Sequence, residues 1–193
     1  MKNTSRIAGI VTFIVTTFGE FLAVYFWLFF FNRDQIVWAI VVLLTGFVIE
    51  RGAVVVHFRI PAQVTDKNGK KSSLILILLF VTTSEILTWI MMLQLSQHLS
   101  YVYGAVIFAV FIHLIHSYES KVILVGEMKT SLLNPGTIIL SLVETIGAVG
   151  LVYCTAHQKP MLGAGVLLGS LLIEHTLQVV GLTAETKGHA AAK

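Results

Sequence analysis

The sequence predicts an all-α integral membrane protein, in which six transmembrane helices form three helical hairpins in one bundle. Three observations support this fold class. Of the 193 residues, 56% are apolar and only 12% are charged, about half the charged share of a soluble domain. Long apolar runs carry a single charge each, such as residues 7–31 with Glu20 and residues 73–100 with Glu85. Lys and Arg gather almost entirely in alternate loops.

The apolar runs define six spans, each long enough to cross about 30 Å of hydrocarbon as a helix. Polar stretches and Pro/Gly turns separate the spans, because these residues end helices. The predicted spans are residues 7–31, 36–58, 73–96, 100–126, 136–156 and 161–182. Residues 1–193 thus form one membrane domain of three hairpins (7–58, 73–126 and 136–182), with a short polar cytoplasmic tail at 183–193.

The distribution of basic residues predicts the orientation of the spans. Ten Lys and Arg residues lie in the N-terminal segment, the second and fourth loops and the C-terminal tail, whereas only Arg33 and Lys159 lie on the opposite side. Loops rich in Lys and Arg stay in the cytoplasm. We therefore expect both termini to be cytoplasmic.

Acidic and histidine side chains recur within the spans at an almost constant spacing. Each hairpin has one such pair, and the separation along the chain differs by no more than a single position among the three pairs. The pairs are Glu20 with Glu50, Glu85 with His116, and Glu144 with Glu174. Isoleucine precedes the second member of each pair. The pattern predicts three hairpins related by a pseudo-threefold repeat, with one polar side chain in each helix.

The rise of about 1.5 Å per helical residue places these six side chains in one layer, slightly cytoplasmic of the bilayer midplane. A carboxylate at that depth costs about 3 kcal/mol or more, so five glutamates need partners, protonation or a cation. Arg51 can offset one of them. His113 and His175 lie on the same helices as two of the six positions and are reserve partners.

Several carboxylates with one or two imidazoles resemble the donor set of carboxylate-bridged di-iron and di-manganese sites, although no Glu-x-x-His motif is present. Such oxygen and nitrogen ligands suit Fe, Mn or Zn, and the single Cys154 argues against a copper site. We expect two divalent metal ions. The candidate ligands are Glu20, Glu50, Glu85, His116, Glu144 and Glu174, with His113 and His175 in reserve.

Three functions fit this pattern. The first is a membrane oxidoreductase, whose metal pair acts on a lipid-soluble substrate or a quinol. The second is a transporter of protons or divalent cations that uses the glutamates in mid-membrane. The third is a non-catalytic subunit of a larger membrane complex that binds haem, chlorophyll or lipid through His113, His116 or His175.

Further partners follow from the remaining sequence features. The lipid bilayer surrounds the spans, and nucleic-acid binding is not expected because no basic stripe with interleaved aromatic residues occurs. Gly165 and Gly169 form a GxxxG pattern in the last span. Such a pattern packs closely either against another helix of the same chain or against a second copy of the chain.

Overall fold

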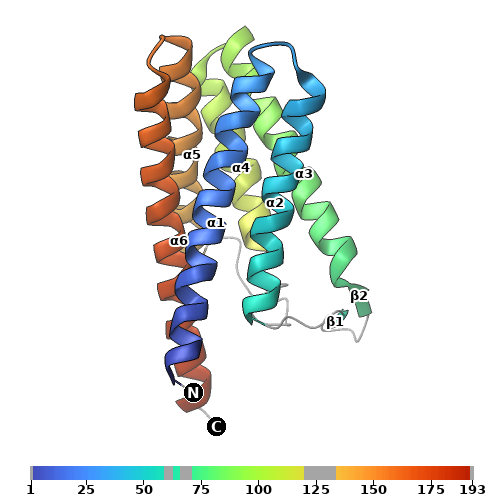
Figure 1. The fold of residues 1–193 in the computed structure, drawn as a ribbon, viewed down its shortest axis with the longest axis vertical. Helices are drawn as coiled ribbons and strands as arrows, with labels where there is room; N and C mark the ends of the chain where they lie inside the picture. Colours follow the sequence, from blue (N-terminus) through green and yellow to red (C-terminus); the bar gives the residue numbers. More distant parts are fainter. Residues whose placement is uncertain (1, 59–62, 66–70, 120–133, 192–193) are drawn as a thin grey trace.

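The computed structural model describes residues 2–58, 63–65, 71–119 and 134–191. They form six long helices and one short two-stranded ribbon (Figure 1). The helices are α1 (Lys2–Phe31), α2 (Ile36–Phe58), α3 (Leu74–His98), α4 (Tyr101–Glu119), α5 (Pro135–Ala156) and α6 (Pro160–Ala191). Strands β1 (Gln63–Thr65) and β2 (Lys71–Ser73) pair antiparallel between α2 and α3.

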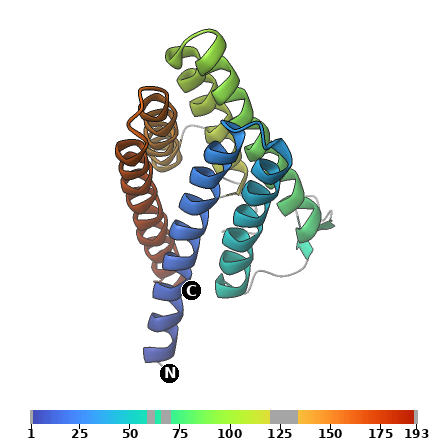
Figure 2. The same ribbon diagram turned by 45° about the horizontal axis from the view of Figure 1, so that its top comes forward.

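The helices are antiparallel neighbours in three hairpins. Each helix packs most extensively on its partner in the chain: α1 on α2, α3 on α4 and α5 on α6. Contacts between α4 and α5 and between α1 and α6 join the hairpins, and α2 meets α3 over a smaller area. Both termini lie at one end of the bundle, and the short links within the hairpins lie at the other (Figures 1 and 2). We call these the terminal end and the link end.

The three links close with the same pair of backbone hydrogen bonds. One residue in each link donates its amide to the carbonyl five positions before it, and its own carbonyl accepts the amide four positions after it. We call these the link residues: Gln35, Ser100 and Lys159. Bonds of this kind satisfy carbonyl groups that a helix C-terminus would otherwise leave unpaired.

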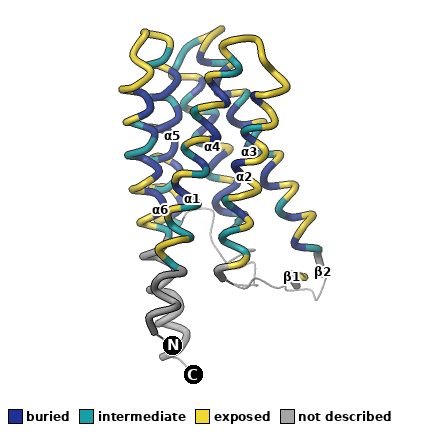
Figure 3. The backbone as a smooth tube through the Cα atoms, in the orientation of Figure 1, coloured by how far each residue is buried: buried dark blue, intermediate teal, exposed yellow. Residues whose placement is uncertain are grey.

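All six helices are long and apolar enough to cross a membrane. Many large apolar side chains are exposed, including those of Val37, Ile75 and Met161. Figure 3 shows that exposed residues recur along all six helices. A soluble monomer rarely exposes so continuous an apolar surface, because it would aggregate in water. The fold therefore belongs to a multi-pass membrane protein.

Aromatic side chains fill the bundle toward its link end. Trp27, Trp89 and Phe108 are fully buried. The ring centroids of the two indoles are 5.9 Å apart, and those of Trp89 and Phe108 are 4.8 Å apart. Trp27 and Trp89 follow the first glutamates of their helices by about two turns and one turn, and so lie closer to the links. We call these three side chains the aromatic layer.

The observed helices match all six predicted spans to within two residues at their link ends, and some helices extend beyond the prediction at the terminal end. Helix α4 is described to Glu119, so residues 120–126 of the predicted fourth span lie outside the described residues. Helix α6 continues to Ala191, so the segment predicted as a polar tail is helical over most of its length.

Candidate metal centre

Seven glutamate and histidine side chains from all six helices meet in one layer, which lies on the terminal side of the aromatic layer. Helices α1 to α5 contribute one each, and α6 contributes two neighbouring residues. They fall into three groups in which one ligand atom of each residue lies within 4.8 Å of the others. The groups are His116, Glu144 and Glu174; Glu20, Glu50 and His175; and Glu20, Glu85 and Glu144.

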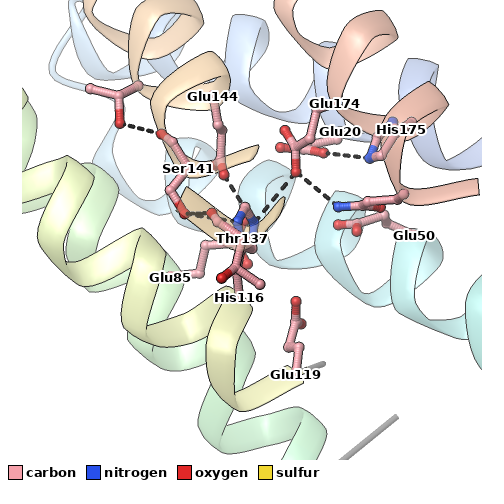
Figure 4. Close-up of polar contacts among 12 residues, drawn as sticks. Glu20, Glu50, Glu85, His116, Glu119, Thr137, Ser141, Glu144, Glu174 and His175 are labelled. Atoms are coloured by element: carbon pink, nitrogen blue, oxygen red, sulfur yellow. Dashed lines mark hydrogen bonds and ion pairs between the residues drawn. The ribbon is translucent and has the colours of Figure 1, made fainter. Parts of the chain in front are cut away.

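The first group joins α4, α5 and α6 around the ring of His116 (Figure 4). Its Nε2 atom lies 3.2 Å from Glu144 Oε2 and 3.4 Å from Glu174 Oε1. A tetrahedral metal with bonds of about 2.0–2.1 Å separates its ligand atoms by about 3.3 Å. The two distances therefore match the edges of a first-row metal site.

The proton positions around His116 follow from its hydrogen bonds. Ser141 donates its single hydroxyl proton to the carbonyl of Thr137 at 2.7 Å. Its oxygen must therefore accept the 3.2 Å bond from His116 Nδ1, which fixes the proton of the neutral ring on Nδ1. The lone pair on Nε2 then faces two carboxylate oxygens. Three hydrogen-bond acceptor atoms repel one another at this distance, so a proton or a cation must lie between them.

The second group joins α1, α2 and α6 in a similar way. His175 Nε2 lies 3.4 Å from Glu20 Oε2, and Glu50 completes the group. The other ring nitrogen, Nδ1, lies 2.9 Å from the hydroxyl of the fully buried Thr17. Each histidine is thus oriented by a hydroxyl on one side and faces carboxylates on the other, an arrangement common among metal-bound histidines.

The third group connects the first two, because it shares Glu20 with one and Glu144 with the other. Its three members are the glutamates of the first helix of each hairpin, and all are buried. Both carboxylate oxygens of Glu144, and Oε2 of Glu174, have no hydrogen-bond donor in the described part of the chain. Buried carboxylate oxygens without donors are costly unless a cation satisfies them.

Arg51 is the buried cation of the layer. Its Nη2 atom binds Glu85 Oε2, and both Nη2 and Nε lie 3.1 Å from Glu119 Oε1. Its Nη1 atom lies 3.7 Å from Glu50 Oε2, a distance that counts as an ion pair although no hydrogen bond forms. The guanidinium therefore connects Glu85 of the third group with Glu50 of the second group and with Glu119 at the end of α4.

The structure brings together seven of the eight side chains that the sequence singles out. Glu20, Glu50, Glu85, His116, Glu144, Glu174 and His175 belong to the groups. His113 is half-buried one turn before His116 and belongs to none of the groups found among the described residues. Glu119, at the end of α4, keeps 22% of its side chain exposed and pairs with Arg51.

Sequence reasoning missed the polar side chains that orient the ligands. Thr17 and Ser141 bind the histidines, and Gln178 donates a 3.0 Å hydrogen bond to Glu174 Oε1. A signal was present, because a hydroxyl residue lies three positions before each first-helix glutamate: Thr17, Thr82 and Ser141. Residues three apart share a helix face, so these hydroxyls point the same way as the carboxylates.

Comparison with known proteins adds no relative: no family model, curated protein or solved structure matches this chain.

Proposed function

We propose that the protein is a membrane-embedded oxidoreductase with two divalent metal ions, one in each of the two histidine-containing groups. The observation that carries this proposal is the orientation of His116, whose Nε2 lone pair faces Glu144 and Glu174. A metal ion between these three atoms removes the conflict, and His175 offers the same environment to a second ion. Fe, Mn and Zn suit such mixed oxygen and nitrogen ligands.

Charge balance supports two ions. The three groups contain five glutamates, and Arg51 supplies one fixed positive charge among them. Two divalent ions bring the total of the layer to zero, with Glu119 left at the partly exposed end. A neutral centre can be buried in hydrocarbon at far lower cost than one with four unbalanced charges.

We also propose that the three hairpins are repeats of one unit. The shared hydrogen bonds of the link residues provide a common origin for counting. At one fixed distance before each link residue the chain has a glutamate, and at one fixed distance after it a basic residue. The glutamates are Glu20, Glu85 and Glu144, and the basic residues are Arg51, His116 and His175. Counting from the links thus pairs His116 with Arg51, whereas the isoleucine pattern in the sequence pairs it with Glu50.

The ten-to-two distribution of Lys and Arg favours a cytoplasmic position for both termini, and we propose that orientation. The polar layer then lies about 22–24 Å from the link end, since about four helical turns separate the two. This depth is on the cytoplasmic side of the midplane of a bilayer about 30 Å thick.

An oxidoreductase agrees better with the bundle than a transporter does. A transporter needs a route to both sides of the membrane, but toward the link end the aromatic layer is fully buried. No Asp or Glu occurs there between the polar layer and Asp34 of the first link. An apolar substrate can instead reach the protein through the bilayer. With dioxygen as the oxidant, two quinols would supply the four electrons and four protons that convert it to two waters.

Elemental analysis of the detergent-purified protein tests the metal pair. We expect close to two Fe or Mn per chain, with oxygen consumption when a short-chain quinol is added; two Zn per chain would support the metal pair but not the redox reaction, because Zn²⁺ does not change its oxidation state. A chain that keeps no metal after expression in metal-replete medium, yet carries protons or divalent cations across liposomes, would refute the proposal in favour of transport. A Soret band would point instead to a haem-binding subunit.

A further inference from the structure

Neighbouring hairpins meet at three junctions, and at two of them the polar residues are combined by the same rule. Each of the two histidine-containing groups combines a histidine from the second helix of one hairpin with two glutamates of the next hairpin in the ring. His175 of the third hairpin meets Glu20 and Glu50 of the first. His116 of the second hairpin meets Glu144 and Glu174 of the third. In both cases the two glutamates stand at equal distances along the chain before and after their link residue.

The junction between the first and second hairpins departs from this rule. The residue in register with the two histidines is Arg51, and its glutamate partner is Glu85, as the rule requires. The remaining glutamate is replaced by Ile115, which stands in the second hairpin where Glu50 and Glu174 stand in the others. This third junction therefore lacks two of the three metal ligands and has a guanidinium in the place of the imidazole.

We propose that Arg51 fills a third, degenerate cation position, so that the centre holds two metal ions and one covalently attached cation instead of three metal ions. The inference rests on the proposed metal pair. Arginine is suited to this role because its guanidinium stays charged and binds carboxylates with a fixed fork. Arg51 is then a positioning residue, which holds Glu85 beside Glu20 and Glu144 and excludes a further ion.

Reciprocal substitutions test this inference, with Zn²⁺ as the probe and zinc per folded chain as the readout. Arg51→His combined with Ile115→Glu gives the third junction one histidine and two glutamates, as at the other two junctions. The zinc content should then rise from two to three ions per chain. His175→Arg combined with Glu50→Ile gives the second group the arginine and isoleucine of the third junction. The zinc content should then fall from two ions to one per chain. Ile115→Glu alone is the matched control and should stay at two, because the guanidinium remains in place.

Each outcome decides the inference. Three zinc ions in the wild type would overturn it, as would an unchanged count of two zinc ions in either folded double variant. If one variant fails to fold, the other decides. If both fail, anomalous zinc scattering from the wild type decides, because a zinc peak beside Arg51 contradicts the inference and two peaks beside the histidines support it. A wild type without zinc refutes the metal pair itself, and the inference falls with it.

Discussion

Replacing Glu144 by Gln tests whether this side chain binds a metal ion or only packs in the bundle. The side chain is 2% exposed and nearly the same size as Gln, so the substitution changes charge with little change in shape. Glu144 belongs to both the first and the third group, and its oxygens have no hydrogen-bond donor in the described residues. Without the Glu144 carboxylate the first group keeps only His116 and Glu174 as ligands. Its affinity for the metal ion should fall by about 100-fold or more, because altering residues that only contact a ligand already costs about 10–100-fold in metal affinity.

The expected effect on stability can be stated in degrees. Free metal at about 100 times its Kd stabilises the folded chain by about 2.7 kcal/mol, whereas metal at about its Kd gives only about 0.4 kcal/mol. For a chain of this size each kcal/mol moves Tm by about 2–4 °C. The rise in Tm on adding Zn²⁺ should therefore drop from about 5–11 °C in the wild type to about 1–2 °C for this ion in the Glu144→Gln variant.

The order of stability should reverse when metal is removed. In excess chelator, one carboxylate oxygen each of Glu20, Glu85 and Glu144 lies within 4.8 Å of the others, and Arg51 compensates only part of their repulsion through Glu85. Gln at position 144 relieves that repulsion, and the variant should then melt no lower than the wild type. The assay is thermal unfolding with Zn²⁺ and with chelator, beside zinc analysis. Glu119→Gln is the control, and it should retain both ions because Glu119 lies outside the triads.

An equal loss of Tm with Zn²⁺ and with chelator would show that Glu144 serves packing alone, and the metal interpretation would then be wrong.

Three further predictions concern topology, ligand orientation and helix packing. In a background with Cys154 replaced by Ala, a cysteine placed within residues 67–72 should react with an impermeant maleimide only in permeabilised cells; labelling of intact cells would contradict the cytoplasmic assignment. Ser141→Ala removes the acceptor of the His116 Nδ1 proton and should weaken zinc binding by about 10–100-fold with the fold intact, measured by competition with a chelator of known affinity; unchanged affinity would show that the hydroxyl does not orient the ring. Gly46→Leu should destabilise the bundle by about 1–3 kcal/mol, because a Cβ there meets Ala23 of α1, whereas Gly165→Leu should leave monomer stability unchanged and abolish any dimer that cross-linking detects in the wild type. A Gly165→Leu variant that unfolds would contradict this difference, since nothing in the described residues lies within 4 Å of a Cβ at that position.

The positions of the buried glutamates could be predicted from the sequence because two physical constraints act on each helix separately. Hydrocarbon excludes an unpaired carboxylate, and the helical rise fixes its depth. Glu20, Glu85 and Glu144 follow from these constraints alone. Which carboxylates share a histidine could not be predicted in this way, since it depends on the order of the helices around the bundle. Glu50, for example, meets His175 only because α6 packs against α1.

The register of the second hairpin shows a different limit. The isoleucine before His116 aligns it with Glu50, because side-chain identity is all that a sequence offers. In the repeat that we propose, counting from the backbone hydrogen bonds of the links shifts that alignment by one residue and pairs His116 with Arg51. In a helix one residue turns the side chain by about 100°, so this shift decides whether a position counts as a ligand or as its neighbour.

The fully buried aromatic layer separates the polar layer from the link end, so we expect ions to reach the proposed metal centre from the terminal end. An ion approaching from the link end would have to shed its hydration among Trp27, Trp89 and Phe108, which offer no carboxylate. Glu50 in the polar layer and Glu119 at the end of α4 keep 16% and 22% of their side chains exposed, and Arg51 lies between them. The metal content of the protein should therefore depend on the metal concentration in the compartment that faces its termini. It should not depend on the metal concentration on the other side of the membrane.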